Sequence, residues 1–484
     1  MNFASWSFIG VFLPLALTGF FVCPVEGNYR RNWLILVSFL FYANTGLVSS
    51  AILAVSIAIN FSAGQTLSTG ELSQKGRLAT LWLAIVANVF ILAAFKVAAL
   101  QSFSGGSFVS SEQVLLPLGL SFITFQQIGY VVSCYRREFS NATPGDYLFF
   151  VLFFPQLIMG PIVRFADMTR QVHAKAFAAV SLHNFAVGLA IFMFGLAKKV
   201  LLADALNEPV DRVFRLAETG FSTPDAYFAA IGFQLQLFLD FTAYAEMSIG
   251  LARIFNISLP IGFDRPLHAI SRLDLWSRWN ITFVMFMREH VFLPLVRTAG
   301  LPIPAALAIT GIISGLWHGL GWTFVMWGLV QTLLLLASNA RSKFARRTGK
   351  LSPLTHIRAI AATFAVTCLV GILFRAGSLE GAVKFYLTLI PDLRAPPGIS
   401  LTGPYAWGGL LLCAFVGWFM PDARSFFTKY WTAVDPRRGG AGREPARTRW
   451  QFDLNYGWGT AAALVMIAVL MRLETSQRFI YVQF

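Results

Sequence analysis

The recurrence of long apolar segments constrains this chain more than any other feature. Apolar runs recur from Phe3 to Met471, and no long polar stretch between them offers a domain boundary. A helix needs about 20 apolar residues to cross ~30 Å of hydrocarbon, and roughly ten runs approach that length. Only 13% of the residues are charged, against about 25% in an average soluble domain. The sequence therefore excludes soluble, secreted, fibrous and fully disordered classes and predicts an all-α, polytopic integral membrane protein.

The placement of the charges predicts how the chain crosses the membrane. Its 38 basic and 23 acidic residues give a net charge of +15. The basic residues gather in short loops, as the positive-inside rule describes, so we interpret them as cytoplasmic and lipid-facing rather than as a nucleic-acid surface. The loops Arg341–Arg358 and Arg424–Arg449 are the clearest cases. The first run, Phe3–Val22, has no basic residue before it and is interpreted as an uncleaved span. With a last span at Gly457–Met471, both termini are predicted to lie outside.

The middle of the chain, from about Leu148 to Leu336, does not divide into clean spans. Proline, glycine and charged residues interrupt its apolar stretches. Non-helical backbone at membrane depth survives only inside protein or along a water-filled cavity, so we expect a cavity here. Cleaner spans are predicted on either side at Trp33–Asn44, Leu47–Phe61, Leu78–Leu100, Val114–Val132, Ala359–Phe374 and Tyr405–Met420.

Ionisable side chains inside the membrane need a partner, a cavity or a function. Gln236, Asp240 and Tyr244 are four residues apart, so a helix would place them on one face, with Glu246 two residues further on. This cluster has two interpretations. It is either a buried polar network that ties helices together or part of a functional site.

A second cluster lies in the segment LDLWSRWNITFVMFMREH. It places Arg278, Trp279 and Asn280 near the start of an aromatic, amphipathic stretch that continues to Arg288. Tryptophan and arginine are ordinary anchors at a membrane surface, so the stretch is either an interfacial helix or a lining of the cavity.

The third cluster is the most suggestive. His318 stands next to Trp317 in an otherwise apolar hairpin. A neutral imidazole can accept a proton from an attacking hydroxyl group, although a lone histidine on an apolar face can equally be a satisfied core residue. The motifs GxSxG, GxxxxGK[ST], HExxH and GxGxxG are all absent, and the four cysteines have no ligand spacing. The sequence thus predicts neither a nucleotide site nor a metal site nor a disulfide.

Eight segments of the chain together resemble one family, the membrane-bound O-acyltransferases, and in particular its branch that O-acetylates bacterial polysaccharides such as alginate. Each segment alone is weak evidence, but all eight follow in family order. They are Leu116–Val132, Phe153–Arg164, Gly195–Asp204, Leu239–Ala252, Leu275–Phe283, Ser314–Gly328, Leu373–Ala382 and the terminal FIYVQF.

The resemblance implies a fold and a site. It implies a single membrane-embedded domain over residues 1–484, with roughly nine to twelve membrane helices, some of them short, tilted or re-entrant. Residues 115–340 would form the catalytic core around a central tunnel, and residues 1–114 and 341–484 would form flanking helices. His318 matches a near-invariant family histidine and would act as general base. Asn280 would stabilise the oxyanion, with Arg278 as a possible second donor.

The remaining residues of the three clusters receive a secondary role. Asp240 and Glu246 would brace the tunnel wall. The other lining or supporting positions are Tyr244, Trp279, Trp317 and Arg288.

Several positions depart from the family pattern. The polysaccharide branch usually has a second histidine where this chain has Asn280, and asparagine occupies that place in lipid-modifying branches. Glu246 stands for an aspartate, Gln331 for a frequent histidine, and Cys134 for a frequent aspartate. These departures leave the substrate, more than the reaction class, open.

The resemblance implies an acetyl transfer that begins at cytoplasmic acetyl-CoA, without a tightly bound cofactor or metal. The acceptor would be an exported or cell-surface polysaccharide, reached through a periplasmic or membrane-anchored acetyltransferase partner, and the location would be a bacterial inner membrane. Two alternatives remain. The acceptor could be a lipid or small metabolite, or the chain could be a non-enzymatic transporter or export subunit that uses its intramembrane charges as a pathway.

Overall fold

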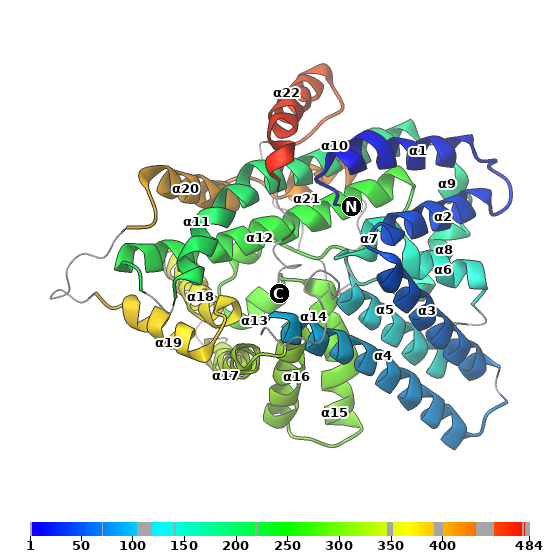
Figure 1. Ribbon diagram of the computed structural model, residues 1–484, viewed down its shortest axis with the longest axis horizontal. Helices are drawn as coiled ribbons and strands as arrows, with labels where there is room; N and C mark the ends of the chain where they lie inside the picture. Colours follow the sequence, from blue (N-terminus) through cyan, green and yellow to red (C-terminus); the bar gives the residue numbers. More distant parts are fainter. Residues whose placement is uncertain are drawn as a thin grey trace. The chain divides into compact units, whose positions relative to one another are not determined.

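Helices make up all the regular structure of the part of the chain that the structure describes (Figure 1). The computed structural model describes residues 2–69, 71–103, 119–139, 142–217, 220–345, 352–391, 400–431, 450–476 and 479. The predicted all-α, polytopic membrane class is confirmed.

Five helical segments are long and apolar enough to cross a membrane, and four shorter apolar helices accompany them among the described residues. The predicted spans correspond to helices at nearly the same positions, except that the start of the predicted span Val114–Val132 lies outside the described residues. The long segments are Leu47–Ser68, Gln74–Ala98, Leu182–Arg215, Trp322–Asn339 and Pro353–Arg375, and the shorter ones are Phe8–Val22, Ile303–His318, Pro404–Phe419 and Tyr456–Arg472.

The chain forms two compact units, and two of its passages between them lie within the helices α10 (Leu182–Ala197) and α12 (Thr223–Ile254). The first unit comprises Met1–Phe194, Tyr244–Ile261 and Tyr430–Arg438, and the second comprises Gly195–Ala243, Gly262–Lys429 and Gly439–Phe484. The single membrane domain inferred from the resemblance remains a prediction. The first unit contains the helices η1 (Phe8–Phe12), α1 (Leu13–Val22), α2 (Tyr29–Ala43), α3 (Leu47–Ser68), α4 (Gln74–Phe103), α5 (Leu120–Tyr135), α6 (Pro144–Leu152), α7 (Phe154–Leu157), α8 (Phe165–Val172), α9 (Lys175–Ala178) and most of α10 (Leu182–Ala197).

Buried amides join three helices of the first unit. Helices α3, α4 and α5 run side by side (Figure 1). The Asn60 amide donates to Gln127 at 3.0 Å, Asn60 and Asn88 exchange hydrogen bonds at 3.1 and 2.6 Å, and the Ser56 hydroxyl donates to Gln127. Polar side chains in apolar helices find partners on neighbouring helices because no water is available there. This network thus fixes the order of the three helices.

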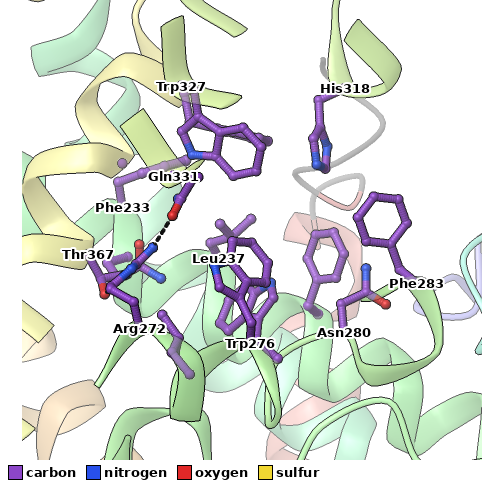
Figure 2. Close-up of a pocket in the computed structure, with 16 residues that line it drawn as sticks. Phe233, Leu237, Arg272, Trp276, Asn280, Phe283, His318, Trp327, Gln331 and Thr367 are labelled. Carbon is purple, nitrogen blue, oxygen red and sulfur yellow. Dashed lines mark hydrogen bonds between the residues drawn. The ribbon is translucent and has the colours of Figure 1, made fainter. Parts of the chain in front are cut away.

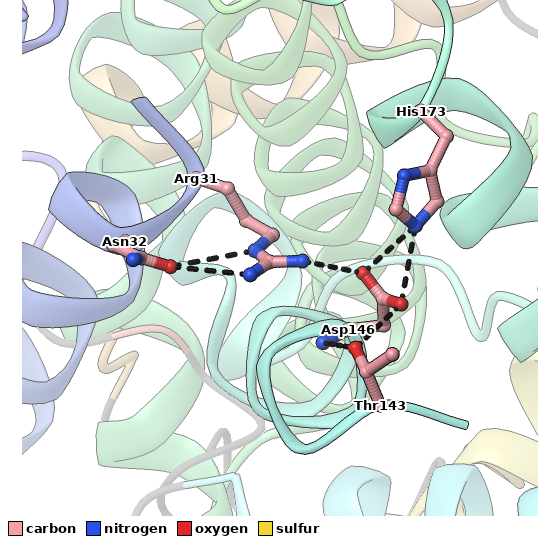
Figure 3. A network of polar contacts seen from close by, with 5 residues as sticks. All are labelled: Arg31, Asn32, Thr143, Asp146 and His173. Carbon is pink, nitrogen blue, oxygen red and sulfur yellow. Dashed lines mark hydrogen bonds and ion pairs between the residues drawn. The ribbon is translucent and has the colours of Figure 1, made fainter. Parts of the chain in front are cut away.

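A second polar network of the first unit surrounds Asp146 (Figure 3). The Arg31 guanidinium of α2 donates to Asp146 at 2.8 Å, and the ring Nε2 of His173 lies 3.1 Å from the same carboxylate. The Thr143 hydroxyl caps α6 by accepting from the Asp146 backbone amide and donating to its side chain. Burial acts to raise the pKa of Asp146, but the hydrogen bonds from Thr143 and His173 and the charge of Arg31 hold the pKa below its usual value. One of the arginines that follow the predicted first span therefore serves as a buried helix-to-helix tie.

The second unit contains the pocket that is described in the next subsection. Its core packs apolar side chains of α11, α12, α18 and α20 around residues such as Phe214, Phe233 and Leu410. Its helices are η2 (Lys198–Ala203), α11 (Asp204–Arg215), α12 (Thr223–Ile254, to Ala243), η3 (Pro266–His268), α13 (Arg272–Trp276), α14 (Ile281–Met287), η4 (Arg288–Phe292), α15 (Leu293–Arg297), α16 (Ile303–His318), α17 (Trp322–Ala345), α18 (Pro353–Arg375), α19 (Leu379–Thr388), α20 (Pro404–Phe419), α21 (Ala423–Phe426), η5 (Thr428–Tyr430), α22 (Tyr456–Arg472) and η6 (Leu473–Thr475).

The polar residues of α12 within this unit tie it to its neighbours. The fully buried Lys199 ammonium lies 2.7 Å from Asp240 and 2.8 Å from Asp204. The Gln236 amide donates to Asn207. The interpretation of this cluster as a buried network between helices therefore fits Gln236 and Asp240.

Candidate functional site

One pocket in the second unit collects side chains from α12, α13, α14, α16, α17 and α18 and from the loop before α14 (Figure 2). Its lining is mostly aromatic, with a few polar groups, which is the usual character of a small-molecule site. Its sixteen lining residues are Phe233, Gln234, Leu237, Phe241, Arg272, Leu275, Trp276, Trp279, Asn280, Phe283, His318, Trp327, Gln331, Thr367, Gly371 and Phe374.

His318 enters the pocket from the end of a helix. It is the last residue of α16, and the backbone turns away at Gly319 in an extended conformation. The ring meets Phe374 edge-on at a centroid distance of 4.8 Å and Trp327 at 5.3 Å. The side chain is only partly buried, and Figure 2 shows the ring pointing into the pocket. His318 is therefore not sealed into dry packing.

Glycines allow the two helices of the hairpin that carries His318 to touch. A Cβ atom on Gly328 of α17 would lie 2.1 Å from the Gly311 carbonyl oxygen of α16, and one on Gly315 would lie 2.2 Å from the Phe324 carbonyl oxygen. Small residues permit such close backbone packing between membrane helices. The end of α16, and with it the imidazole, is held by this contact.

Asn280 lies between α13 and α14 with a left-handed backbone, φ 41° and ψ 55°. The Ile281 amide donates to the Gly262 carbonyl at 2.8 Å, and the Asp264 amide donates to the Arg278 carbonyl at 2.9 Å, so the loop is pinned on both sides. Asparagine and histidine adopt this conformation more readily than most residues. In Figure 2 the Asn280 amide extends toward the space below the His318 ring. A left-handed turn at Asn280, near the start of the predicted amphipathic stretch, thus separates α13 from α14.

The two predicted tryptophans differ in position. Trp279 lines the pocket and meets Phe263 edge-on at 5.3 Å. Trp317 is buried behind the pocket and stacks on Phe283, a lining residue, at 4.6 Å. Trp317 thus supports the wall without lining it.

The remaining predicted residues do not line the pocket. Arg278 pairs with Asp274 at 3.0 Å, and Arg288 is exposed in η4. Tyr244 and Glu246 belong to the first unit, where the Tyr244 ring stacks on Phe3 at 5.1 Å. The pocket thus brings together His318, Asn280 and Trp279 from the predicted set and leaves Asp240, Tyr244, Glu246, Arg278, Trp317 and Arg288 outside its lining.

A buried polar group of the pocket was missed by the sequence analysis. Arg272, at the start of α13, is only 6% exposed and donates to Gln331 at 2.5 Å and to Thr367 at 2.6 Å. The sequence shows a basic residue at position 272 in the irregular middle region. It does not show that Gln331 and Thr367 are its hydrogen-bond partners, because the three residues come together only in the folded chain. Among the described residues, no group of three His, Cys, Asp or Glu side chains has the arrangement of a metal site.

A base candidate and a hydrogen-bond donor that share an aromatic pocket are suited to acyl transfer, and comparison with known proteins gives the same class. The family model of the membrane-bound O-acyltransferases matches residues 79–374. The chain belongs to this family and is a membrane O-acyltransferase.

The relatives are named for three different polymers: peptidoglycan, alginate and teichoic acid. The chain is 34% identical to a peptidoglycan O-acetyltransferase of Helicobacter pylori, over 78% of this chain and 77% of that protein. It is 31% identical to a probable alginate O-acetylase AlgI of Pseudomonas aeruginosa, over 80% of this chain and 74% of the relative. It is 26% identical to a teichoic acid D-alanyltransferase of Bacillus subtilis, over 52% of this chain and 66% of the relative.

Proposed function

We propose that the pocket transfers an acetyl group from acetyl-CoA to a hydroxyl group, with His318 as general base. The observation that carries this proposal is that the His318 imidazole and the Asn280 amide face the same pocket in a membrane O-acyltransferase. As the acceptor oxygen attacks the thioester carbonyl carbon, the neutral imidazole takes the hydroxyl proton. General-base help of this kind contributes about 100- to 10,000-fold.

Asn280 acts on the charge that develops in this step. Attack places a negative charge on the former carbonyl oxygen, to which the Asn280 amide donates a hydrogen bond. The carbon–sulfur bond then breaks, the protonated His318 returns its proton to the leaving thiolate, and free coenzyme A departs. The aromatic walls limit competition by water, because few lining groups can bind it.

The charges and the relatives support a wider setting for this reaction, which we propose as follows. The basic cytoplasmic loops attract the phosphates of acetyl-CoA, and residues 115–340 form the tunnel and catalytic core of a single domain. With both termini outside, the acetyl group reaches the outer face of an inner membrane. Since two relatives are named for peptidoglycan and alginate O-acetylation, we propose a cell-surface polysaccharide as the final acceptor, served by a separate acetyltransferase partner outside the membrane.

Substitution of His318 tests the mechanism. The His318→Ala variant is expected to insert and fold, but its rate of acetyl transfer from labelled acetyl-CoA should fall by at least about 100-fold. The matched control is His356→Ala, an exposed histidine of α18 outside the pocket, which should keep full activity. Full activity of the His318 variant in purified protein would refute the base role. A transporter would move its substrate without releasing coenzyme A, so thiol release from labelled vesicles separates that alternative.

A further inference from the structure

Among the residues that the structure describes, the positive charge of Arg272 in this pocket has no acidic partner. Arg272 donates to the side-chain oxygens of Gln331 and Thr367, and both of these partners are neutral. Its Nε atom is buried and has no hydrogen-bond partner in the described part of the chain. None of the sixteen described lining residues is an aspartate or a glutamate. Within the described ranges, the guanidinium in this pocket is therefore not compensated by a carboxylate.

Burying a charged group without a partner lowers the stability of a folded protein. A buried charge normally has an ion-pair partner or another compensating group, and an ionisable residue within a membrane protein marks a functional site when it has neither. Burial lowers the pKa of Arg272 to about 10, so the side chain still carries its charge at neutral pH. The missing partner is therefore best supplied by a ligand.

The position of the group is compatible with that role. Figure 2 shows Arg272 and Gln331 on one side of the pocket and His318 with Asn280 on the other. Gln331 of α17 and Thr367 of α18 fix the guanidinium, and the Ser271 hydroxyl caps α13 by accepting from the Asp274 amide. A guanidinium fixed in this way is preorganised to bind a carboxylate or phosphate oxygen.

We propose that Arg272 binds an anionic oxygen group, a carboxylate or a phosphate, of the substrate held in the pocket, and so selects an anionic substrate. This proposal rests on the proposed acyl transfer in the same pocket. The anion can belong to the acceptor or to the donor. The shared chemistry is one charge-assisted hydrogen bond to the guanidinium.

The test compares matched substrates with and without the anion. For the donor, acetyl-CoA is compared with S-acetylpantetheine, which has no phosphate. For the acceptor, a uronic acid tetrasaccharide, offered as a direct acceptor in the absence of the partner acetyltransferase, is compared with its carboxyl-reduced form. Arg272→Gln is expected to raise KM about 10- to 100-fold for the anionic member of one pair, while KM for the neutral member stays the same.

A second variant separates binding from structure. Gln331→Glu keeps an acceptor for the Arg272 guanidinium but supplies a permanent internal carboxylate. If Arg272 only ties α13 to α17, this variant should keep its stability and its KM values. If Arg272 binds a substrate anion, KM should rise for the same anionic substrate as in Arg272→Gln. The control is Thr363→Val on α18, which removes a buried hydroxyl that donates to the Ala359 carbonyl outside the pocket.

The outcome is distinguishable from failure of the proposed mechanism. Equal KM changes for both members of each pair, or no change in Gln331→Glu, would overturn the anion site. Calorimetric binding of coenzyme A, pantetheine and the two tetrasaccharides repeats the comparison without turnover. If His318→Ala remains active while Gln331→Glu selectively weakens the anionic ligand, the base assignment fails and the anion site stands.

Discussion

At the scale of single residues, the backbone of Asn280 restricts what can replace it. Its left-handed conformation costs most side chains roughly 1–2 kcal/mol, whereas glycine adopts it routinely and asparagine more readily than most residues. The same conformation presents the amide to the pocket. Asn280 therefore provides both the backbone conformation of the turn and the proposed hydrogen-bond donor. A series of substitutions can separate these two contributions.

We predict that Asn280→Ala lowers acetyl transfer by about 100-fold or more, the usual cost of losing one oxyanion donor. It should also lower the thermal unfolding midpoint, because alanine is strained at this φ. Asn280→Gly relieves the strain without restoring the amide, so it should be equally slow but more stable than the alanine variant. Wild-type transfer rates in Asn280→Gly would show that the amide has no role in the reaction.

At the scale of elements, the packing of α16 against α17 fixes the position of His318 in the pocket. A Cβ atom on Gly315 or Gly328 would meet only backbone atoms of the other helix, so no flexible side chain could move aside for an added methyl group. The helices would have to separate, and the imidazole would move with the end of α16. Catalytic geometry tolerates displacements of well under 1 Å, so such a shift should slow the reaction.

We predict that Gly328→Ala destabilises the protein by about 1–3 kcal/mol, the usual cost of overpacking, and lowers transfer more than tenfold. The measurements are the thermal unfolding of the detergent-solubilised protein and its rate of acetyl transfer at saturating acetyl-CoA. Gly408→Ala is the matched control, because a Cβ atom at this position of α20 meets nothing within 4 Å. It should be neutral or slightly stabilising, since alanine favours helix over glycine. If both variants behave alike, the close contact does not position the site.

At the scale of the whole molecule, the net charge of +15 and the location of the basic residues in loops predict how the protein is oriented in the membrane. Basic loops resist translocation, so the basic segment after Arg424 should stay in the cytoplasm while both termini lie outside. Acetyl-CoA would then approach from the side that carries the positive charge.

This orientation can be measured with a protease-sensitive tag. A tag at either terminus should be cleaved by protease added to intact spheroplasts, whereas a tag inserted between residues 440 and 445 should be cleaved only after lysis. The opposite pattern would reverse the proposed direction of transfer. Steady expression of all three tagged forms is the control, because a misfolded form would be degraded.

The fold was more predictable from the sequence than the site. Helices α18, α20 and α22 begin and end within several residues of their predicted spans, because an apolar run of spanning length has one stable solution in lipid. The break at Asn280 was not predicted, since tryptophans and apolar residues continue on both sides of it. Its left-handed turn depends on backbone partners at Gly262 and Asp264, which sequence patterns do not reveal.

The sequence by itself determined the membrane class, the helices and, through a family resemblance, the histidine that the pocket contains. The tertiary structure decided which polar residues share that pocket. It placed Asp240 against Lys199 in a buried network and Arg272 in the pocket wall, although both are ionisable residues in the same irregular region. The physical reason is that apolar periodicity is local along the chain, whereas the partner of a buried charge comes from distant residues and exists only once the helices have packed.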